Sequence, residues 1–239
     1  MSTIIRKGAR TEIVYPTSDG RPMAETDQHR KLMNDLIQTL ETYYAVDPRV
    51  YVSGNLLLFY EPGNRRRHIA PDVFVVKGVP KRERLNYLIW EEGKGPDVTI
   101  ELTSSSTRHE DQETKFRRYQ DVLHVKEYFL FDPLGDYLQP PLQGYRLRAG
   151  VYQPIRSLHG RLPSKILGLH LEQVGSQLRL YDPTATKWLP TPQERIAHAE
   201  AEIERVAREQ ELPQERLARA EAEIERLHRE VEELRRHLK

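Results

Sequence analysis

Two acidic side chains stand on neighbouring predicted strands of this sequence, and their type suits a divalent metal ion. Asp72 follows Ala70-Pro71 and opens the apolar run from Val73 to Val76, while Glu101 lies in the run from Asp97 to Thr103. In that second run every other residue is apolar, so Glu101 is expected on the polar face of its strand. Magnesium typically takes one or two carboxylates from a protein and keeps several waters. If the two strands pair, Asp72 and Glu101 form a candidate metal site.

A lysine near two such carboxylates would complete the requirements for phosphodiester cleavage. That reaction needs a divalent cation, a positioned water, and positive charge where the transition state becomes negative. Lys115 lies on a predicted helix from Arg108 to Leu123, directly after the strand that carries Glu101. From the residues alone we favour a plainer interpretation, because Asp111 and Lys115 are four residues apart and can form a helix salt bridge.

Three further polar residues are weaker candidates. Glu25 and His29 stand near the start of a helix predicted from Thr26 to Tyr44, where a first-turn acid and an exposed histidine have ordinary structural explanations. Asp97 shares a strand face with Glu101 but lies about 13 Å from it, at ~3.3 Å per residue. That separation is too large for one ion, so a cap, a loop contact or a water-mediated contact to DNA is the favoured role of Asp97.

The elements that must position these residues alternate between strands and helices. Apolar residues recur at helical spacing after Thr26, and β-rich runs cover 49–60, 72–76, 97–103 and 127–131. This order predicts an α/β fold in which a mixed sheet is flanked by helices. The part from Leu134 to Tyr181 predicts an antiparallel β extension, with a hairpin that turns at Ala149-Gly150. We therefore assign residues 1–182 to one domain.

Composition narrows the classes of function. With 239 residues the chain can bury one globular core and carry an additional segment. It has no cysteine, which excludes disulfides, thiolate nucleophiles and cysteine-based zinc sites. The formal net charge of +1 argues neither for nor against nucleic acid. No apolar run reaches the length of a membrane span and no signal-peptide pattern opens the sequence, so we expect a soluble cytoplasmic protein without a membrane partner.

The C-terminal tail has a heptad pattern. The seven residues from Ala199 recur identically from Ala220, three heptads later. Residues 183–192 are rich in proline and predict a linker, and residues 193–239 predict a coiled-coil tail interrupted near Pro213. We expect this tail to form a homodimer, although a single solvated helix with i,i+4 charge pairs would also fit the pattern. Position a is taken by Ile196, Ile203, Gln210, Leu217, Ile224, Val231 and Leu238.

The motifs together resemble a known family. Pro71-Asp72, Glu101 and Lys115 resemble the PD-(D/E)XK nuclease superfamily, and the runs Pro96 to Thr107 and Val125 to Asp132 are similar to its Uma-two-type restriction-endonuclease-like family. The resemblance spans roughly residues 13–182. It implies a restriction-endonuclease-like core and a magnesium- or manganese-dependent endonuclease that hydrolyses DNA.

The resemblance also implies roles for individual residues. Asp72 and Glu101 would hold the metal, and Lys115 would assist water activation or stabilise transition-state charge, because Thr103 stands where the superfamily usually has its lysine. Glu25, His29, Asp97 and Asp111 would be accessory residues of the same site. Two alternatives remain: a catalytically degenerate DNA-binding protein on a nuclease scaffold, and an assembly protein that acts through its coiled coil.

Overall fold

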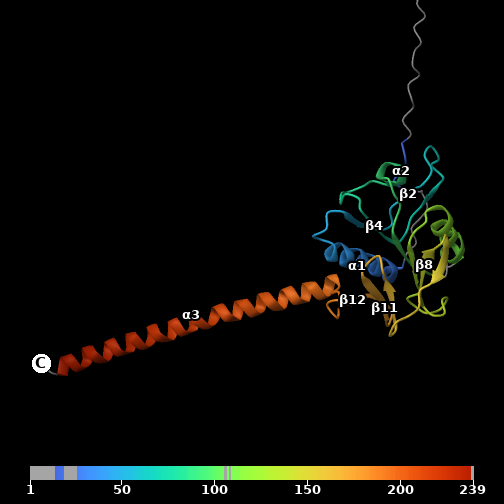
Figure 1. Ribbon diagram of the computed structural model, residues 1–239. Helices are drawn as coiled ribbons and strands as arrows, with labels where there is room; N and C mark the ends of the chain where they lie inside the picture. Colours follow the sequence, from blue (N-terminus) through green and yellow to red (C-terminus); the bar gives the residue numbers. More distant parts are fainter. Residues whose placement is uncertain (1–13, 19–25, 105–106, 108, 238–239) are drawn as a thin grey trace, which may run out of the picture. The chain divides into compact units, whose positions relative to one another are not determined.

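The computed structural model describes residues 14–18, 26–104, 107 and 109–237, which divide into two compact units, Met1–Thr191 and Pro192–Lys239. Within the second unit, side chains are described for residues 192–208, 217–219 and 221–229. The first unit is a mixed α/β structure built on one mixed sheet (Figure 1). None of the helices in the described ranges is both long and apolar enough to cross a membrane.

The main sheet has six strands in the order β1-β4-β6-β7-β8-β9. Only β6 and β7 are parallel, and the other neighbours are antiparallel. The parallel pair is joined by a helical crossover, as a parallel connection requires. The strands are β1 (Val50–Ser53), β4 (Val73–Lys77), β6 (Val98–Leu102), β7 (Glu127–Phe131), β8 (Leu142–Arg148) and β9 (Val151–Pro154).

One face of this sheet is covered by helix α1 (Asp27–Tyr43) and by a four-stranded antiparallel sheet. The side chain of Thr26 caps α1 by accepting a hydrogen bond from the N–H of His29 (3.2 Å), which confirms the predicted helix start. Apolar residues of α1 at helical spacing pack on this face: Leu32, Met33, Leu36 and Leu40. The second sheet consists of β10 (Arg161–Ser164), β11 (Leu169–Val174), β12 (Gln177–Asp182) and β13 (Lys187–Trp188).

The opposite face is covered by two π-helical stretches, η1 (Glu110–Lys115) and η2 (Arg118–Val122), and by a small sheet in the order β3-β2-β5. The alternation of strand residues separates the two faces, since Val73 and Val75 pack toward α1 while Phe74 and Val76 pack toward this side. The remaining elements are β2 (Leu58–Phe59), β3 (His68–Ile69), β5 (Tyr87–Leu88) and the short helix α2 (Ile89–Glu92).

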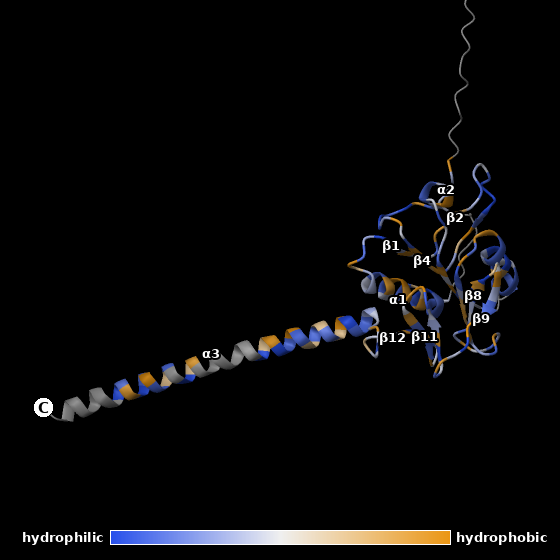
Figure 2. Cartoon of the chain, viewed as in Figure 1, coloured by the Kyte–Doolittle hydropathy of each residue, from blue (hydrophilic) through white to orange (hydrophobic). Residues whose placement is uncertain are grey.

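This double coverage changes the environment of Glu101. All five residues of β6 are buried, so the polar face of the strand does not meet solvent. Val98, Ile100 and Leu102 pack on the α1 side, which turns Thr99 and Glu101 toward η1 and η2. In Figure 2 apolar residues are concentrated on the strands inside this unit, while polar residues dominate the connecting segments. Glu101 is therefore a buried carboxylate beneath a helical segment.

The sequence prediction is wrong at two places near the tail. Residues 183–192 contain β13, which pairs with β12 through Tyr181 and Trp188, so this segment belongs to the four-stranded sheet and is not a linker. The second unit is a single helix, α3 (Pro192–His237), which continues through Pro213 without the predicted interruption. Residues of high helix propensity on both sides of Pro213 favour continuation, which outweighs the local cost of one proline.

Candidate active site

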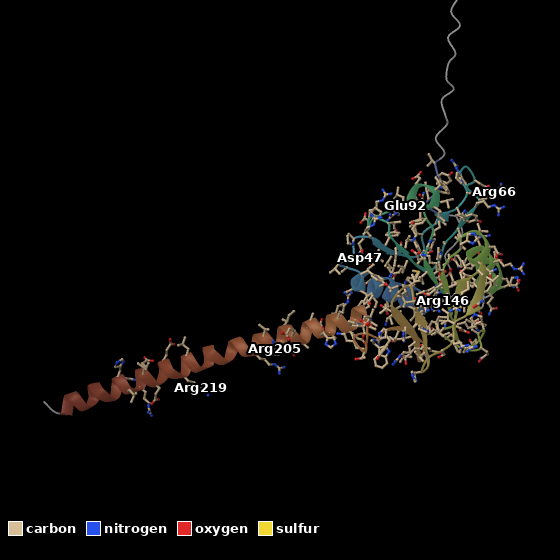
Figure 3. All side chains as sticks on the ribbon, in the orientation of Figure 1. Asp47, Arg66, Glu92, Arg146, Arg205 and Arg219 are labelled. Carbon is tan, nitrogen blue, oxygen red and sulfur yellow. The ribbon has the colours of Figure 1, made fainter. Side chains whose placement is uncertain are left out.

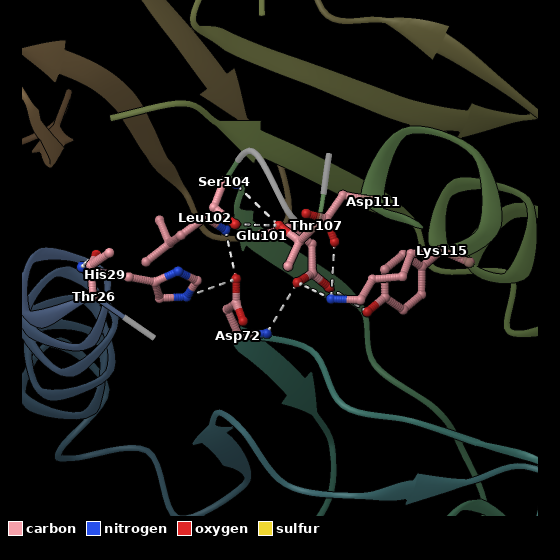
Figure 4. Close-up of polar contacts among 10 residues, drawn as sticks. Thr26, His29, Asp72, Glu101, Leu102, Ser104, Thr107, Asp111 and Lys115 are labelled. Carbon is pink, nitrogen blue, oxygen red and sulfur yellow. Dashed lines mark hydrogen bonds and ion pairs between the residues drawn. The ribbon is translucent and has the colours of Figure 1, made fainter. Parts of the chain in front are cut away.

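The two candidate metal ligands lie opposite each other where β4 begins and β6 ends. Val73 pairs with Ile100 in the antiparallel register of these strands, which brings Asp72 beside Glu101. The N–H of Asp72 donates a hydrogen bond to Glu101 Oε2 (3.3 Å), and the N–H of Leu102 donates to Asp72 Oδ2 (2.7 Å). Figure 4 shows both carboxyl groups side by side. The predicted strand pairing thus places the two acids in one site.

A close backbone approach fixes the peptide of Asp72. Gly54, just after β1, lies so near that a Cβ atom there would stand 2.0 Å from the carbonyl oxygen of Asp72. The next residue, Asn55, donates its N–H to the carbonyl of Pro71 (2.8 Å). Only glycine permits this approach at position 54. The turn after β1 therefore helps to set the position of Asp72.

Lys115, on η1, contacts the carboxylates of Glu101 and Asp111. Its Nζ lies 2.7 Å from Glu101 Oε2 and 3.1 Å from Asp111 Oδ1. The side chains of Glu101 and Asp111 are almost completely buried, and that of Lys115 is 12% exposed. The helix salt bridge with Asp111 and the contact with Glu101 therefore exist together. Lys115 thus contacts Glu101 from the helical segment and not from β6.

Tyr119 is a further residue of the site that was not among the candidates from the sequence. Its hydroxyl donates a hydrogen bond to Glu101 Oε1 (2.5 Å), and its side chain is fully buried. Asp111, Lys115 and Tyr119 recur at every fourth residue, so they share one face of the helical segment. This four-residue spacing is the signal in the sequence that could have identified Tyr119 as a residue of the site. The two oxygens of Glu101 are consequently held by two different partners, Tyr119 and Lys115.

His29 is, besides Asp111, an accessory residue that the structure brings to the pocket. Its Nε2 lies 3.3 Å from Asp72 Oδ2, and its side chain is 12% exposed. The position of His29 follows from the cap of α1, because the first turn of the helix begins at Thr26. Glu25, the other candidate on this segment, lies outside the described residues.

Asp97 is not brought into the pocket. It lies just before β6, at the end of that strand opposite Glu101, where its carboxylate contacts Lys94 Nζ and Lys126 Nζ, each at 2.7 Å. The N–H of Lys77 donates a third contact of 2.7 Å. Burial acts to raise the pKa of Asp97, but these donors outweigh it and lower the pKa. Its accessory role in the site is therefore replaced by a structural one.

Asp72 and Asp111 line a pocket of about 230 Å³, whereas Glu101 is fully buried next to them and is not part of the pocket wall. The lining of the pocket includes His29, Asp72, Asp111 and Lys115, together with residues from the segments that follow β6 and β7. One of these segments is held by Asp132, a buried carboxylate that accepts hydrogen bonds from four backbone N–H groups between Leu134 and Leu138. The pocket is thus bounded by α1, η1 and two strand ends of the main sheet.

The electrostatics of the pocket reflect an excess of acid. Burial raises the pKa of Glu101 to about 8, against the effect of the Lys115 ammonium. Burial also raises the pKa of Asp111. For Asp72, burial is outweighed by the hydrogen bond from His29 and the charge of Lys115, which lower its pKa. Burial acts to lower the pKa of Lys115, but the surrounding carboxylates raise it well above its ordinary value, so Lys115 stays an ammonium.

These residues fit a divalent cation. Three carboxylates surround one lysine, which leaves two uncompensated negative charges when all three are ionised. Asp111 Oδ2 is buried and accepts no hydrogen bond within the described part of the chain. In the same part, no three histidine or carboxylate side chains form a ready-made ligand cluster. Asp72 and Glu101 could thus be the protein ligands of a magnesium ion, and water and phosphate oxygens would fill its remaining coordination positions.

Comparison with known proteins gives two results. A family model described as "Uma2: Putative restriction endonuclease" matches residues 7–177. The chain is also similar to a crystal structure of a putative nuclease belonging to DUF820 from Anabaena variabilis ATCC 29413, with 15% sequence identity and a TM-score of 0.46 over 62% of this chain and 79% of that chain. No curated protein matches the sequence.

Proposed function

Because the chain belongs to the Uma2 family of putative restriction endonucleases, we propose that it is a metal-dependent endonuclease that hydrolyses DNA phosphodiester bonds. The observation that carries this proposal is the meeting of Asp72, Glu101, Asp111 and Lys115 in one cluster at the edge of the pocket. Two carboxylates on adjacent strands and an ammonium beside them are features that this chemistry requires. In this proposal Asp72 and Glu101 are the metal ligands.

A bound magnesium or manganese ion would supply positive charge at the scissile phosphate and lower the pKa of a water molecule. The protein's own side chains would orient the reaction. Tyr119 and Lys115 hold the two oxygens of Glu101 in fixed directions, and His29 and the N–H of Leu102 do the same for Asp72 Oδ2. Such fixed donors and acceptors lower the reorganisation that the reaction requires.

The contacts of Lys115 favour one of its two candidate roles. Its ammonium forms ion pairs with Glu101 and Asp111, whose charges raise its pKa, and a protonated group is suited to stabilising negative charge rather than to acting as a general base. It acts as a fixed positive charge that can donate hydrogen bonds to the phosphate oxygens as they gain charge. Asp111, beside it, keeps the ammonium in position through the 3.1 Å ion pair.

The test of this function is the nicking of a supercoiled plasmid by the full chain. We expect conversion to the open circular form with Mg²⁺ or Mn²⁺ and none in the presence of EDTA. Salt-sensitive DNA binding without nicking under any divalent ion would instead favour the degenerate, DNA-binding alternative. Such a result would contradict the proposal for this pocket and leave the family assignment intact.

We also propose that α3 joins two copies of the chain in a parallel coiled coil. Heptad positions along its described part are apolar and exposed, among them Ile196, Ile203, Leu217 and Ile224, which are 55–69% exposed. A helix that leaves an apolar seam in solvent gains stability when a second helix covers it. Figure 2 shows apolar residues recurring among polar ones along α3.

This pairing predicts the effect of a charge in the seam. Ile224→Arg should convert a dimer to a monomer, because a buried arginine at position a would face its copy. Ala222→Arg, on the outward side of the same turn, is the matched control and should leave the dimer intact. Light scattering after size exclusion measures the mass directly. A wild-type monomer, or a dimer that persists in Ile224→Arg, would contradict the pairing.

A further inference from the structure

The hairpin formed by β2 and β3, residues 58–69, carries consecutive arginines and leads along the chain to Asp72. We propose that this arginine hairpin is a docking arm for the phosphate backbone of the DNA duplex that the pocket cuts. The proposal rests on the proposed function for the identity of its partner. It assigns a binding role to Arg65 and Arg66, which lie outside the pocket.

The hairpin is held in a defined conformation. The N–H of Tyr60 donates to the carbonyl of Arg67 (3.1 Å), and the N–H of Arg67 donates to the carbonyl of Asn64 (3.2 Å). Tyr15 supports the turn from outside, since its hydroxyl accepts a hydrogen bond from the N–H of Gly63 (2.6 Å) and its ring lies 5.0 Å from that of Phe59. A pre-ordered arm loses little conformational entropy when it binds.

Two of its arginines are uncompensated. Arg67 pairs with Glu61 at 3.3 Å, whereas Arg65 and Arg66 have no acidic partner within the described ranges. Both side chains are exposed, and Figure 3 shows Arg66 at the edge of the folded unit, pointing outward. Guanidinium groups bind phosphate oxygens through paired N–H donors. The turn therefore presents two phosphate-binding groups to solvent.

The hairpin is connected to both parts of the pocket. β3 leads through Ala70 and Pro71 directly to Asp72. Arg66 and Asp72 are six positions apart in the chain, which limits the distance between their Cα atoms to about 20 Å at roughly 3.6 Å per residue. Along a duplex that distance corresponds to about six base pairs at ~3.4 Å each. A duplex with its scissile phosphate in the pocket would therefore extend far enough to meet the arginines.

A second connection runs through η2. Arg118 Nη1 donates a hydrogen bond to the carbonyl of His68 (3.3 Å), and its guanidinium lies 5.8 Å from the ring centroid of Tyr60. Arg118 follows Lys115 by three residues, on the same helical segment. The hairpin base is thus tied to η2, which follows η1 and Lys115 in the chain, and the segment after β3 leads to Asp72. Its position relative to the pocket is fixed from both sides.

The charge of the pocket explains why DNA binding would need basic groups outside it. The pocket wall carries Asp72 and Asp111 but a single lysine, Lys115, so the pocket offers no excess of positive charge to a polyanion. Affinity for DNA must then come from basic groups outside the pocket, since phosphate contacts dominate such binding. Arg65 and Arg66 would supply two of these contacts without reading base sequence.

The test separates binding from cleavage. Binding of the full chain to a fluorescent 30-base-pair duplex is measured in EDTA, where no hydrolysis occurs, at several NaCl concentrations. Each lost phosphate contact lowers the slope of log K against log[salt] by about 0.9. Arg65→Ala/Arg66→Ala should therefore reduce the slope by about 2 and weaken binding at least tenfold. Arg66→Ala alone should reduce it by about 1.

Arg148 offers a matched control, because it is also an exposed arginine beside a hairpin turn, at Ala149-Gly150. β8 is antiparallel to β7, so Arg148 lies near the start of β7 and away from the pocket end. Arg148→Ala should keep the wild-type slope. Equal effects of Arg66→Ala and Arg148→Ala would overturn the proposal, as would wild-type binding by the double variant or no DNA binding by the wild type.

The outcomes test the docking role of the arginine hairpin separately from the proposed hydrolysis of DNA. If the wild type nicks plasmid DNA but the double variant binds as tightly as wild type, the arm is wrong and the catalytic function stands. If no divalent ion supports nicking but binding depends on Arg65 and Arg66, the arm stands and hydrolysis falls. Tighter, arginine-dependent binding to duplex RNA would overturn DNA as the partner.

Discussion

Glu101→Gln is expected to reduce metal-dependent nicking by at least about 100-fold, or about 2.7 kcal/mol of transition-state stabilisation. Gln keeps the shape of Glu101 but lacks its charge. Its amide can accept from either Tyr119 or Lys115, and it then turns an N–H group toward the other, so one of the two present contacts is lost. The metal would lose one of its two protein ligands. Asp72→Asn should have an effect of the same order.

The rate is measured from the disappearance of supercoiled plasmid at saturating Mg²⁺, after thermal unfolding has shown that each variant is folded. Asp97→Asn is the matched control, because Asp97 is also a buried carboxylate at one end of β6 but contacts Lys94 and Lys126 outside the pocket. It should retain the wild-type rate. Nicking by Glu101→Gln within about twofold of wild type would exclude Glu101 from the reaction.

Lys115→Met is expected to lower the nicking rate by about 100-fold while the protein binds Mg²⁺ or Mn²⁺ more tightly. The ammonium now lies 2.7 Å from Glu101 Oε2 and thus competes with a cation for that oxygen. Met fills similar volume without charge, so Glu101 and Asp111 lose their common partner. A divalent ion should then stabilise this variant against heat more than it stabilises the wild type.

A lower nicking rate together with tighter metal binding would distinguish a catalytic role of Lys115 from a purely structural salt bridge. Metal affinity is followed by calorimetry, and the rate by the plasmid assay. Lys126→Met provides the control, since Lys126 also pairs with a buried acid at 2.7 Å, but at Asp97. Neither its metal affinity nor its rate should change. If Lys115→Met kept full activity, Lys115 would be only the partner of Asp111 that its four-residue spacing suggests.

The sequence was sufficient to predict β4 and β6, the two strands whose ends carry Asp72 and Glu101. Alternation placed Glu101 opposite the apolar face of β6, and the Pro-Asp start of β4 placed Asp72 at a strand end. The catalytic role of Lys115 depended on family resemblance, because spacing alone equally supported an ion pair with Asp111. In the structure Lys115 contacts both Asp111 and Glu101. The residue pattern of one helix face could not indicate that Glu101 lies beneath that face.

Other features could not be read from local pattern. The hydroxyl of Tyr119 meets Glu101 only because η1 and η2 pack on the polar face of β6, a tertiary relation that one sequence does not encode locally. β5 and α2 lie between the predicted strand runs 72–76 and 97–103, and β13 lies within the segment interpreted as a linker. These elements are two to four residues long, too short for a periodic signal.

The most direct test of the central claim is a crystal structure of the protein soaked in Mn²⁺, in which anomalous scattering locates the ion. We predict one ion between the carboxylates of Asp72 and Glu101, at about 2.1 Å from an oxygen of each. Lys115 Nζ would then have moved from its present 2.7 Å contact with Glu101. A pocket without manganese at saturating concentration, with Lys115 still bonded to Glu101, would contradict the account.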